Sequence, residues 1–145
     1  MVFITNKSDF DKWVEETQNQ IIEEDLKQYS KKVVDLFYNP KNWGSMENFN
    51  KKSKYKGPCG DTIQFFLKIS DDNIIKEVKF ITDGCGASVA AGSITTILIK
   101  NKPVQYALNL TADDIDRELD GLPDDHKHCS LLAERSLKEA LKDYV

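Results

Sequence analysis

Three cysteines stand where a sulfur atom could do chemistry, because each lies at the boundary of a predicted element and not inside an apolar run. Cys59 is in Gly-Pro-Cys-Gly-Asp, Cys85 is in Gly-Cys-Gly-Ala-Ser, and Cys129 follows His-Lys-His. Cys85 comes at the end of a strand-like stretch and opens a helix of small residues. The free N–H groups and the dipole of a helix start favour a thiolate, which is a better metal ligand and nucleophile than a thiol.

The cysteines are far apart along the chain and form no Cys-x-x-Cys pair, so their spacing is not that of a zinc finger. Taken singly, each is also consistent with a small buried hydrophobe. Their positions favour a shared site, because a small antiparallel sheet with helices on one face can bring such element ends to one edge. Three thiolates with Asp61 or His128 would make a tetrahedral set suited to zinc or to the irons of a small cluster. The alternatives are a turn cap for Asp61 and a solvent-exposed side chain for His128.

The composition is that of one acidic globular domain of 145 residues, long enough to bury a core without disulfides. A net charge of −4 argues against nucleic acid as a partner. The longest uncharged stretch, 84–99, is short and rich in small residues, so we expect no membrane partner and no targeting segment. Three widely spaced cysteines suit a reducing compartment, and we expect a cytoplasmic protein.

Two helices are predicted in the first part of the chain. Ser8 and Asp11 have the spacing of a capping box, and apolar residues follow at helical spacing over about 9–27. We expect this acidic surface helix to pack by its apolar stripe against the rest of the chain, with a dimer contact through Trp13 as the alternative. A second helix is expected over 29–37, ended by the Asn, Pro and Gly residues of 39–44.

A polar stretch over 45–58 is expected to be mostly loop, with a short strand leading into Cys59. It carries a run of lysines at positions 51, 52, 54 and 56, which is typical of a solvated loop but could contact an acidic protein surface. Alternating apolar residues then predict an antiparallel hairpin of strands 62–69 and 74–82, joined by the turn residues Asp71, Asp72 and Asn73.

The second half of the chain is predicted to be helical. The stretch 87–99 contains β-branched residues and Gly92, but its apolar positions share one helical face and it carries no charge, which favours a buried central helix. A short helix is expected over 103–108. A capping box at Thr111 begins another helix, to about 119, and a last helix is expected over 129–144.

At the level of motifs, the chain resembles the NifU/IscU-type scaffold proteins of iron-sulfur cluster assembly. The resemblance covers about 29–144 and includes four motifs in the family's order. These are Asn39-Pro40-Lys41-Asn42-Trp43-Gly44, Gly57-Pro58-Cys59-Gly60-Asp61, Gly84-Cys85-Gly86-Ala87-Ser88 and His128-Cys129-Ser130-Leu131-Leu132-Ala133-Glu134.

This resemblance implies an α+β fold, with a small, mainly antiparallel three-stranded sheet and helices packed on one face. It implies a scaffold domain over 29–145 preceded by an N-terminal helical extension over 1–28. The function implied is a scaffold, not an enzyme, on which a [2Fe-2S] cluster is built from iron and persulfide sulfur and then passed on. A cysteine desulfurase and iron-sulfur acceptor or carrier proteins are the implied partners, and a homodimer is a further expectation.

The resemblance also implies the role of each site residue. Cys59, Asp61, Cys85, His128 and Cys129 would hold the cluster or its iron, and zinc in the isolated protein. Asp61 would keep the cluster labile, because a carboxylate is a poorer partner for iron than a thiolate. Cys129 would accept the persulfide sulfur, which requires an exposed sulfur with a lowered pKa.

Some features depart from the family or leave other functions open. Bacterial housekeeping members have Leu-Pro-Pro-Val-Lys before the histidine, where this chain has Leu122-Pro123-Asp124-Asp125-His126, so dependence on a dedicated chaperone does not carry over. His126 is an alternative metal ligand. A zinc-dependent persulfide sulfurtransferase is the alternative function, and a purely structural zinc module is a third interpretation.

Overall fold

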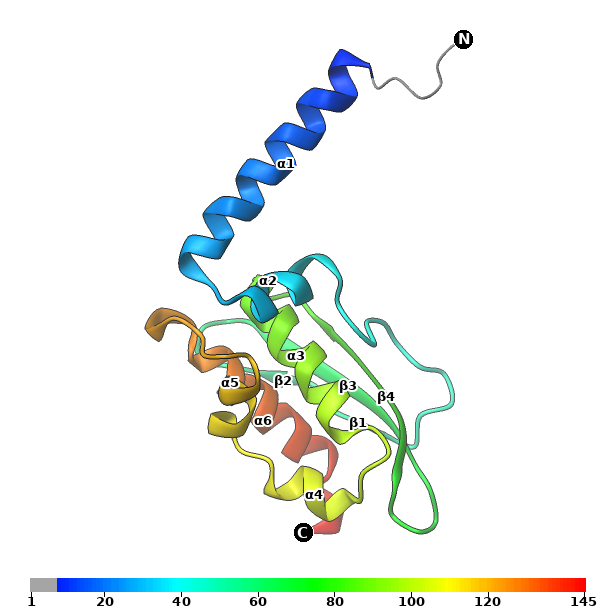
Figure 1. Ribbon diagram of the computed structural model, residues 1–145. Helices are drawn as coiled ribbons and strands as arrows, with labels where there is room; N and C mark the ends of the chain where they lie inside the picture. The colour runs from blue at the N-terminus through cyan, green and yellow to red at the C-terminus, as the bar shows by residue number, and fades with distance from the viewer. Residues whose placement is uncertain (1–7) are drawn as a thin grey trace.

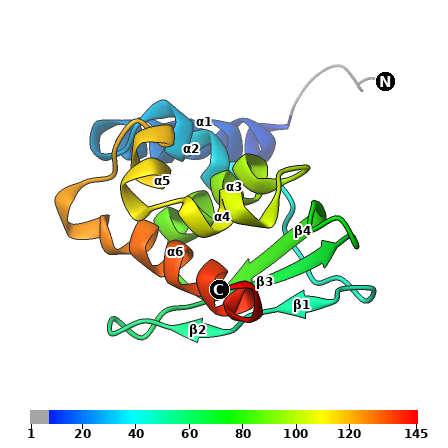
Figure 2. The ribbon, with the colours of Figure 1, turned by 90° about the horizontal axis from the view of Figure 1, so that it is seen from below.

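The computed structural model describes residues 8–145, which form a small antiparallel sheet covered on one face by helices (Figures 1 and 2). The α+β prediction is therefore confirmed. The helices are α1 (Asp9–Gln28), α2 (Lys31–Tyr38), α3 (Gly86–Ile99), α4 (Val104–Asn109), α5 (Ala112–Glu118) and α6 (His128–Ala140), with 3-10 turns at Asp124–His126 and Lys142–Tyr144. The strands are β1 (Lys51–Lys52), β2 (Tyr55–Lys56), β3 (Thr62–Ile69) and β4 (Ile75–Thr82).

The sheet is a three-stranded arrangement whose outer strand is in two pieces. β3 and β4 form the predicted hairpin, with Leu67 opposite Val78. β1 and β2 both pair with the other side of β3 and keep one continuous register. The break between them falls at Ser53, whose hydroxyl accepts a hydrogen bond from the Phe65 N–H at 3.0 Å. A side-chain oxygen thus joins the ladder at the point where the outer strand is interrupted.

Alternation along the hairpin separates a buried face from an open one. Ile63, Phe65 and Leu67 of β3 and Phe80 of β4 have no exposed surface and face α3 and α6. The residues between them, such as Gln64, are on the opposite face, which no helix covers (Figure 2). This period-two pattern is what the sequence predicted for a half-buried hairpin. It is broken at Phe66, which lies on the opposite face but is buried against Phe49.

The central helix α3 forms as predicted, despite its β-branched residues. It is buried along most of its length against the sheet and α6. Two of its buried hydroxyls are satisfied within the helix, because Thr95 Oγ1 donates to the Ala91 carbonyl at 2.7 Å and Thr96 Oγ1 donates to the Ser93 carbonyl at 2.6 Å. Burial of the apolar face therefore outweighs a weak helix propensity.

The N-terminal helix does not pack as expected. α1 projects away from the body of the protein (Figure 1) and none of its residues is buried. It is tied to α2 at its C-terminal end, where the Tyr38 hydroxyl donates to Asp25 Oδ2 at 2.6 Å. The expectation that its apolar stripe packs on the rest of the chain is wrong for residues 8–28. The remainder of the expected 1–28 extension, 1–7, lies outside the described residues.

Two predicted helix boundaries also need correction. α2 begins at Lys31 and not at Tyr29, because Ser30 is its N-cap and accepts from the Val33 N–H at 3.2 Å. The last helix ends at Ala140 and is followed by a 3-10 turn. The capping box at Thr111 is confirmed in both of its hydrogen bonds. Over residues 8–145, no helix combines the length and the apolar character needed to cross a bilayer.

Candidate metal centre

Cys59 and Asp61 are placed by a tight turn between β2 and β3. The Gly57 N–H donates to the Asp61 carbonyl at 2.9 Å, and the Gly60 N–H donates back to the Gly57 carbonyl at 3.0 Å. Gly60 has φ +93°, a conformation that glycine adopts without a Cβ penalty. Cys59 is exposed at the tip of this turn, and Asp61 is half-buried where β3 begins.

Cys85 is the N-cap residue of α3, as predicted. Its carbonyl accepts from the N–H groups of Ser88 and Val89, and its side chain makes no capping hydrogen bond, so the sulfur is available to other partners. Gly84 lies directly before it because there is no room for a side chain. A Cβ there would stand 2.6 Å from Ser88 Oγ and 3.1 Å from Asp61 Oδ2.

The start of α6 supplies the third cysteine and its histidine neighbours. Cys129 is in the first turn of α6 and is buried, and His128 beside it is exposed. The two side chains are in contact, with His128 Nε2 3.7 Å from the Cys129 sulfur. His126, from the preceding 3-10 turn, brings its Nδ1 to 3.9 Å from the Cys85 sulfur. Its ring packs at 5.5 Å from that of Tyr29.

The structure brings all of the sequence-predicted site residues to one edge of the molecule. Their ligand atoms fall into two groups, in each of which the atoms lie within 4.8 Å of one another. One group is Cys85, His126 and Cys129, and the other is Cys59, Asp61 and His128. The contact between His128 and Cys129 joins the groups. Three sulfurs, two imidazoles and a carboxylate are the donors that zinc or iron-sulfur clusters take.

The thiols of Cys85 and Cys129 are coupled, and their pKa values are shifted in opposite directions. The pKa of Cys85 is lowered to about 4, chiefly because the Cys129 thiol donates a hydrogen bond to it. The N–H groups of Ser88 and Ala87 at the start of α3 lower the Cys85 pKa further, and partial burial opposes them. The pKa of Cys129 is raised, because its proton is held in that hydrogen bond and its sulfur is buried. Cys85 is therefore the thiolate of the pair.

The expectation that Cys129 is an exposed thiolate is wrong. It has no exposed surface and belongs to the apolar core cluster, although its sulfur faces polar neighbours. The Ser88 hydroxyl donates to this sulfur at 3.4 Å. The exposure and lowered pKa expected of Cys129 are found instead at Cys85, because Cys85 caps a helix from outside whereas Cys129 is within the first turn, facing the core.

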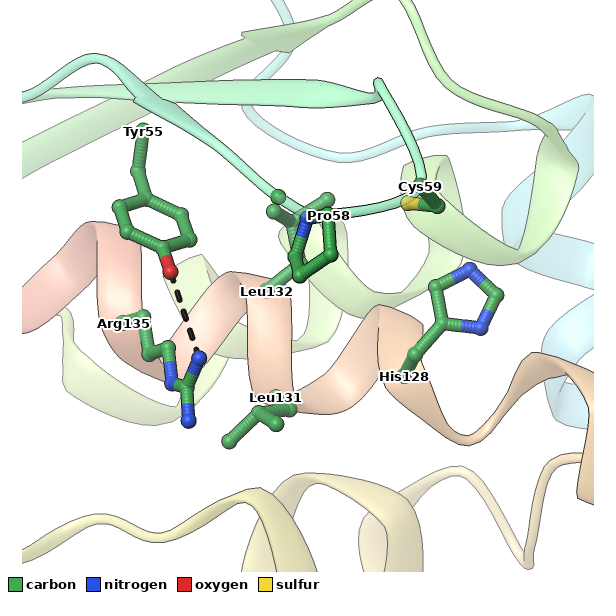
Figure 3. A pocket seen from close by; sticks show the side chains of 8 residues that line it. Tyr55, Pro58, Cys59, His128, Leu131, Leu132 and Arg135 are labelled. Atoms are coloured by element: carbon green, nitrogen blue, oxygen red, sulfur yellow. Dashed lines mark hydrogen bonds between the residues drawn. The ribbon is translucent and has the colours of Figure 1, made fainter.

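An apolar pocket of about 200 Å³ opens beside the second ligand group (Figure 3). Cys59 and His128 lie at one end of it, and Tyr55 and Arg135 lie at the other, joined by an Arg135 to Tyr55 hydroxyl hydrogen bond of 3.4 Å (Figure 3). Its walls are otherwise apolar, from Pro58, Leu131 and Leu132. The sulfur of Cys59 is thus reachable from the surface.

Sequence reasoning gave no role to two residues that shape the site. Ser88 donates a hydrogen bond to the Cys129 sulfur, and no sequence signal pairs these two residues, which lie 41 positions apart. Tyr29 packs on His126 and its own pKa is raised, first by burial and then by the nearby Cys85. No signal in the sequence pairs Tyr29 with the site, because the contact depends on how α1 and α2 meet.

The comparisons with known proteins agree with this geometry. The model of the family described as "NifU-like N terminal domain" matches residues 28–145. An iron-sulfur cluster assembly scaffold protein IscU of Aquifex aeolicus is 44% identical over 120 residues, covering 81% of this chain and 76% of the relative. The protein of the same name from Escherichia coli K12 is 39% identical over 121 residues, covering 80% of this chain and 93% of the relative.

Solved structures have the same fold. A crystal structure described as an iron-sulfur cluster assembly scaffold for the SUF system, from Fervidobacterium islandicum, has a TM-score of 0.62 and 26% identity, covering 78% of this chain and 96% of that one. A NifU-like N-terminal structure from Brucella abortus has a TM-score of 0.61 at 15% identity, covering 78% of this chain and 91% of that one, and it shows the fold alone.

Proposed function

This chain belongs to the NifU-like N-terminal domain family, and from this premise we propose that it is a scaffold for iron-sulfur cluster assembly. The scaffold binds iron and sulfide as cargo and passes the finished cluster to other proteins. Relatives at about 40% identity over 80% of the chain carry that name, so a zinc-dependent sulfur relay is not favoured.

The observation that carries this proposal is the pair of joined ligand groups. Each iron of a two-iron cluster is held by bridging sulfides and by two protein ligands, so the cluster needs four protein donors. The two groups offer six, at an edge where Cys59, Cys85 and His128 are exposed. We propose a [2Fe-2S] cluster held by ligands drawn from Cys59, Asp61, Cys85, His128 and Cys129. His126 is a further donor, because it contacts Cys85.

Asp61 is proposed to keep the cargo releasable. Its half-buried carboxylate shares a ligand group with Cys59 and His128. A hard carboxylate oxygen binds iron less firmly than a soft thiolate does. A cluster held partly by Asp61 therefore dissociates toward an acceptor more easily than one held by four thiolates.

Cys129 is proposed as the acceptor of persulfide sulfur. Its thiolate attacks the outer sulfur of the donor persulfide, the donor S–S bond breaks, and the donor leaves as a thiolate. The Cys129 proton must leave before the attack, and His128, whose Nε2 lies 3.7 Å from the Cys129 sulfur, is the neighbouring base that takes it. Cys85 is not that base, because its lowered pKa leaves the proton on Cys129. Reduction of the new S–S bond takes two electrons from an external thiol or electron carrier, and it yields hydrosulfide and the Cys129 thiolate. Because Cys129 is buried, its neighbours His128 and Cys85 must move aside during the attack.

The partners of a scaffold follow from its cargo. A sulfur donor must deliver persulfide at this edge, and acceptor proteins must reach the finished cluster there. We propose a cysteine desulfurase as the donor. The apolar pocket beside Cys59 offers such partners a place to set an apolar side chain while the sulfur remains reachable.

Anaerobic reconstitution tests the proposed function. The full chain is incubated with ferrous iron, cysteine and a cysteine desulfurase, and iron, acid-labile sulfide and visible absorption are measured. We expect a chromophore with two irons and two sulfides per site. Loss of the chromophore in Cys59→Ser, with the fold intact by circular dichroism, would agree with the proposal. Stoichiometric zinc and no chromophore under any of these conditions would refute it.

A substitution of Asp61 tests the releasing role separately. Asp61→Ala should hold its cluster longer against a chelator than the unsubstituted chain does, because the weaker oxygen ligand is gone. Asp71→Ala is the matched control, since Asp71 is an exposed carboxylate in the hairpin turn. If Asp61→Ala folds normally but binds no cluster, Asp61 is a required ligand and the argument on lability is wrong.

A further inference from the structure

The sheet face that turns away from the helices is basic. Side chains of the outer strand point alternately to the two faces of the sheet. Lys52, opposite Phe66, and Lys56, opposite Thr62, lie on this face. Its rim carries two acidic side chains, Glu77 and Asp83, among the residues that the structure describes. Its cations are the exposed lysines Lys52, Lys54, Lys56, Lys68 and Lys79. The lysine run that was expected to be a solvated loop is therefore the edge of an open sheet surface.

This face is also hollowed. A cavity of about 580 Å³ runs over it, lined by Lys54, Lys56, Gln64 and Ile81, with Trp43 at its side. Trp43 is 46% exposed and packs edge-on against Phe80. The cavity offers two apolar side chains, Trp43 and Ile81, and its other lining residues are polar or charged, with Lys54 and Lys56 on the outer strand. Apolar contacts beside lysines are what an acidic amphipathic segment would fit.

Helix α1 is such a segment. One side of it carries Phe10, Trp13, Val14 and Ile21, which are between 40% and 69% exposed. α1 carries seven acidic residues, four of which are glutamates, and two lysines. A solvent-exposed apolar stripe on a strongly acidic helix is unusual for an isolated molecule, because its burial would stabilise the protein.

The α1 helix of the same molecule does not lie on that face. α1 projects beyond the end of the body on the helical side, near the level of α2, whereas the open sheet face is turned the other way (Figures 1 and 2). The lengths are well matched, since twenty helical residues rise about 30 Å and an eight-residue strand extends about 26 Å. A second molecule can therefore offer its helix to the face that this molecule leaves open.

We propose that two copies of this chain pair by exchanging α1, each helix lying across the basic sheet face of the other copy. The apolar stripe around Trp13 covers the cavity beside Trp43. Glu16 and Glu24, which flank the stripe on its Trp13 side, face the lysines of the outer strand. The two groups of metal-ligand residues lie at one end of the sheet, and the exchanged helix does not cover them.

Sedimentation of the full chain tests this pairing. We expect a species of twice the 16.5 kDa chain mass, with a dissociation constant that rises with salt because the attraction is partly between exposed charges. Trp13→Ala and, separately, the charge reversal Lys54→Glu with Lys56→Glu should each weaken it by about tenfold or more. Both sets of residues are exposed, so the fold is retained.

Matched substitutions distinguish this pairing from other associations. Leu26→Ala on the opposite side of α1 and Lys100→Glu away from the sheet face should leave the dissociation constant unchanged. Combining the lysine reversals with Glu16→Lys and Glu24→Lys in one chain should restore the dimer, since both surfaces then exchange sign. A monomer at all concentrations overturns the proposal. A dimer sensitive to Trp13 but not to the lysines overturns it too, because the helices would then pair with each other.

Discussion

Gly84 offers a direct test of how closely the site is packed. Alanine at this position places a Cβ 2.6 Å from Ser88 Oγ and 2.8 Å from Ser88 Cβ. The Ser88 hydroxyl can rotate away, but its Cβ is fixed to the first turn of α3. The backbone must therefore shift, and Ser88 then loses its hydrogen bond to Cys129.

The size of the effect follows from the contact. Gly84 is half-buried, but its Cβ site is filled, and overpacking such a position by one methyl costs about 1–3 kcal/mol of unfolding free energy when neighbours cannot yield. In a chain that also carries Ser88→Gly, both Ser88 atoms are absent, and only Asp61 Oδ2 remains near the added Cβ, at 3.1 Å and at the movable end of a side chain. Alanine at position 84 should then cost less than about 1 kcal/mol, because the Asp61 carboxylate can shift and the unfolded chain loses entropy.

A double-mutant cycle measures this difference. The four chains are unfolded in urea without metal and followed by circular dichroism, and the coupling free energy should be at least about 1 kcal/mol. The Ser88→Gly chain is the internal control for the loss of the hydroxyl and of helix propensity. If Gly84→Ala costs the same in both backgrounds, contact with Ser88 is not the reason for glycine at this position.

Further predictions concern the two thiols and the break in the outer strand. In the metal-free protein, iodoacetamide should modify Cys85 well before Cys129, because Cys85 is exposed and ionised whereas Cys129 is buried and protonated; mass spectrometry that finds Cys129 modified first would contradict this. Since the pKa of Cys85 is depressed, its alkylation rate should stay nearly constant from about pH 8 to about pH 6, while an ordinary thiol slows about a hundredfold. Ser53→Ala should cost about 1–3 kcal/mol of unfolding free energy in urea, because the Phe65 N–H loses its buried partner, and exposed Ser45→Ala should cost nothing measurable.

The sequence determined the local structure of this protein. Alternation at 62–69 and 75–82 specified the hairpin, and Thr111 specified a helix start through its own capping box. The glycines around Cys85 predicted a cysteine at a helix start. These features depend on residues within a few positions of each other, so the interactions that form them can be read directly from the chain.

Only the tertiary structure decided how the parts meet. It brought Cys59, Cys85 and Cys129 to one edge, buried Cys129 against Ser88, and set His126 beside Cys85. It also left α1 projecting, where the sequence predicted packing. The exposure and pKa of a thiol depend on neighbours that are distant along the chain, and these are fixed only when helices pack on the sheet. The residue types of the site are therefore local information, whereas the division of the proton between Cys85 and Cys129 is a property of the folded whole.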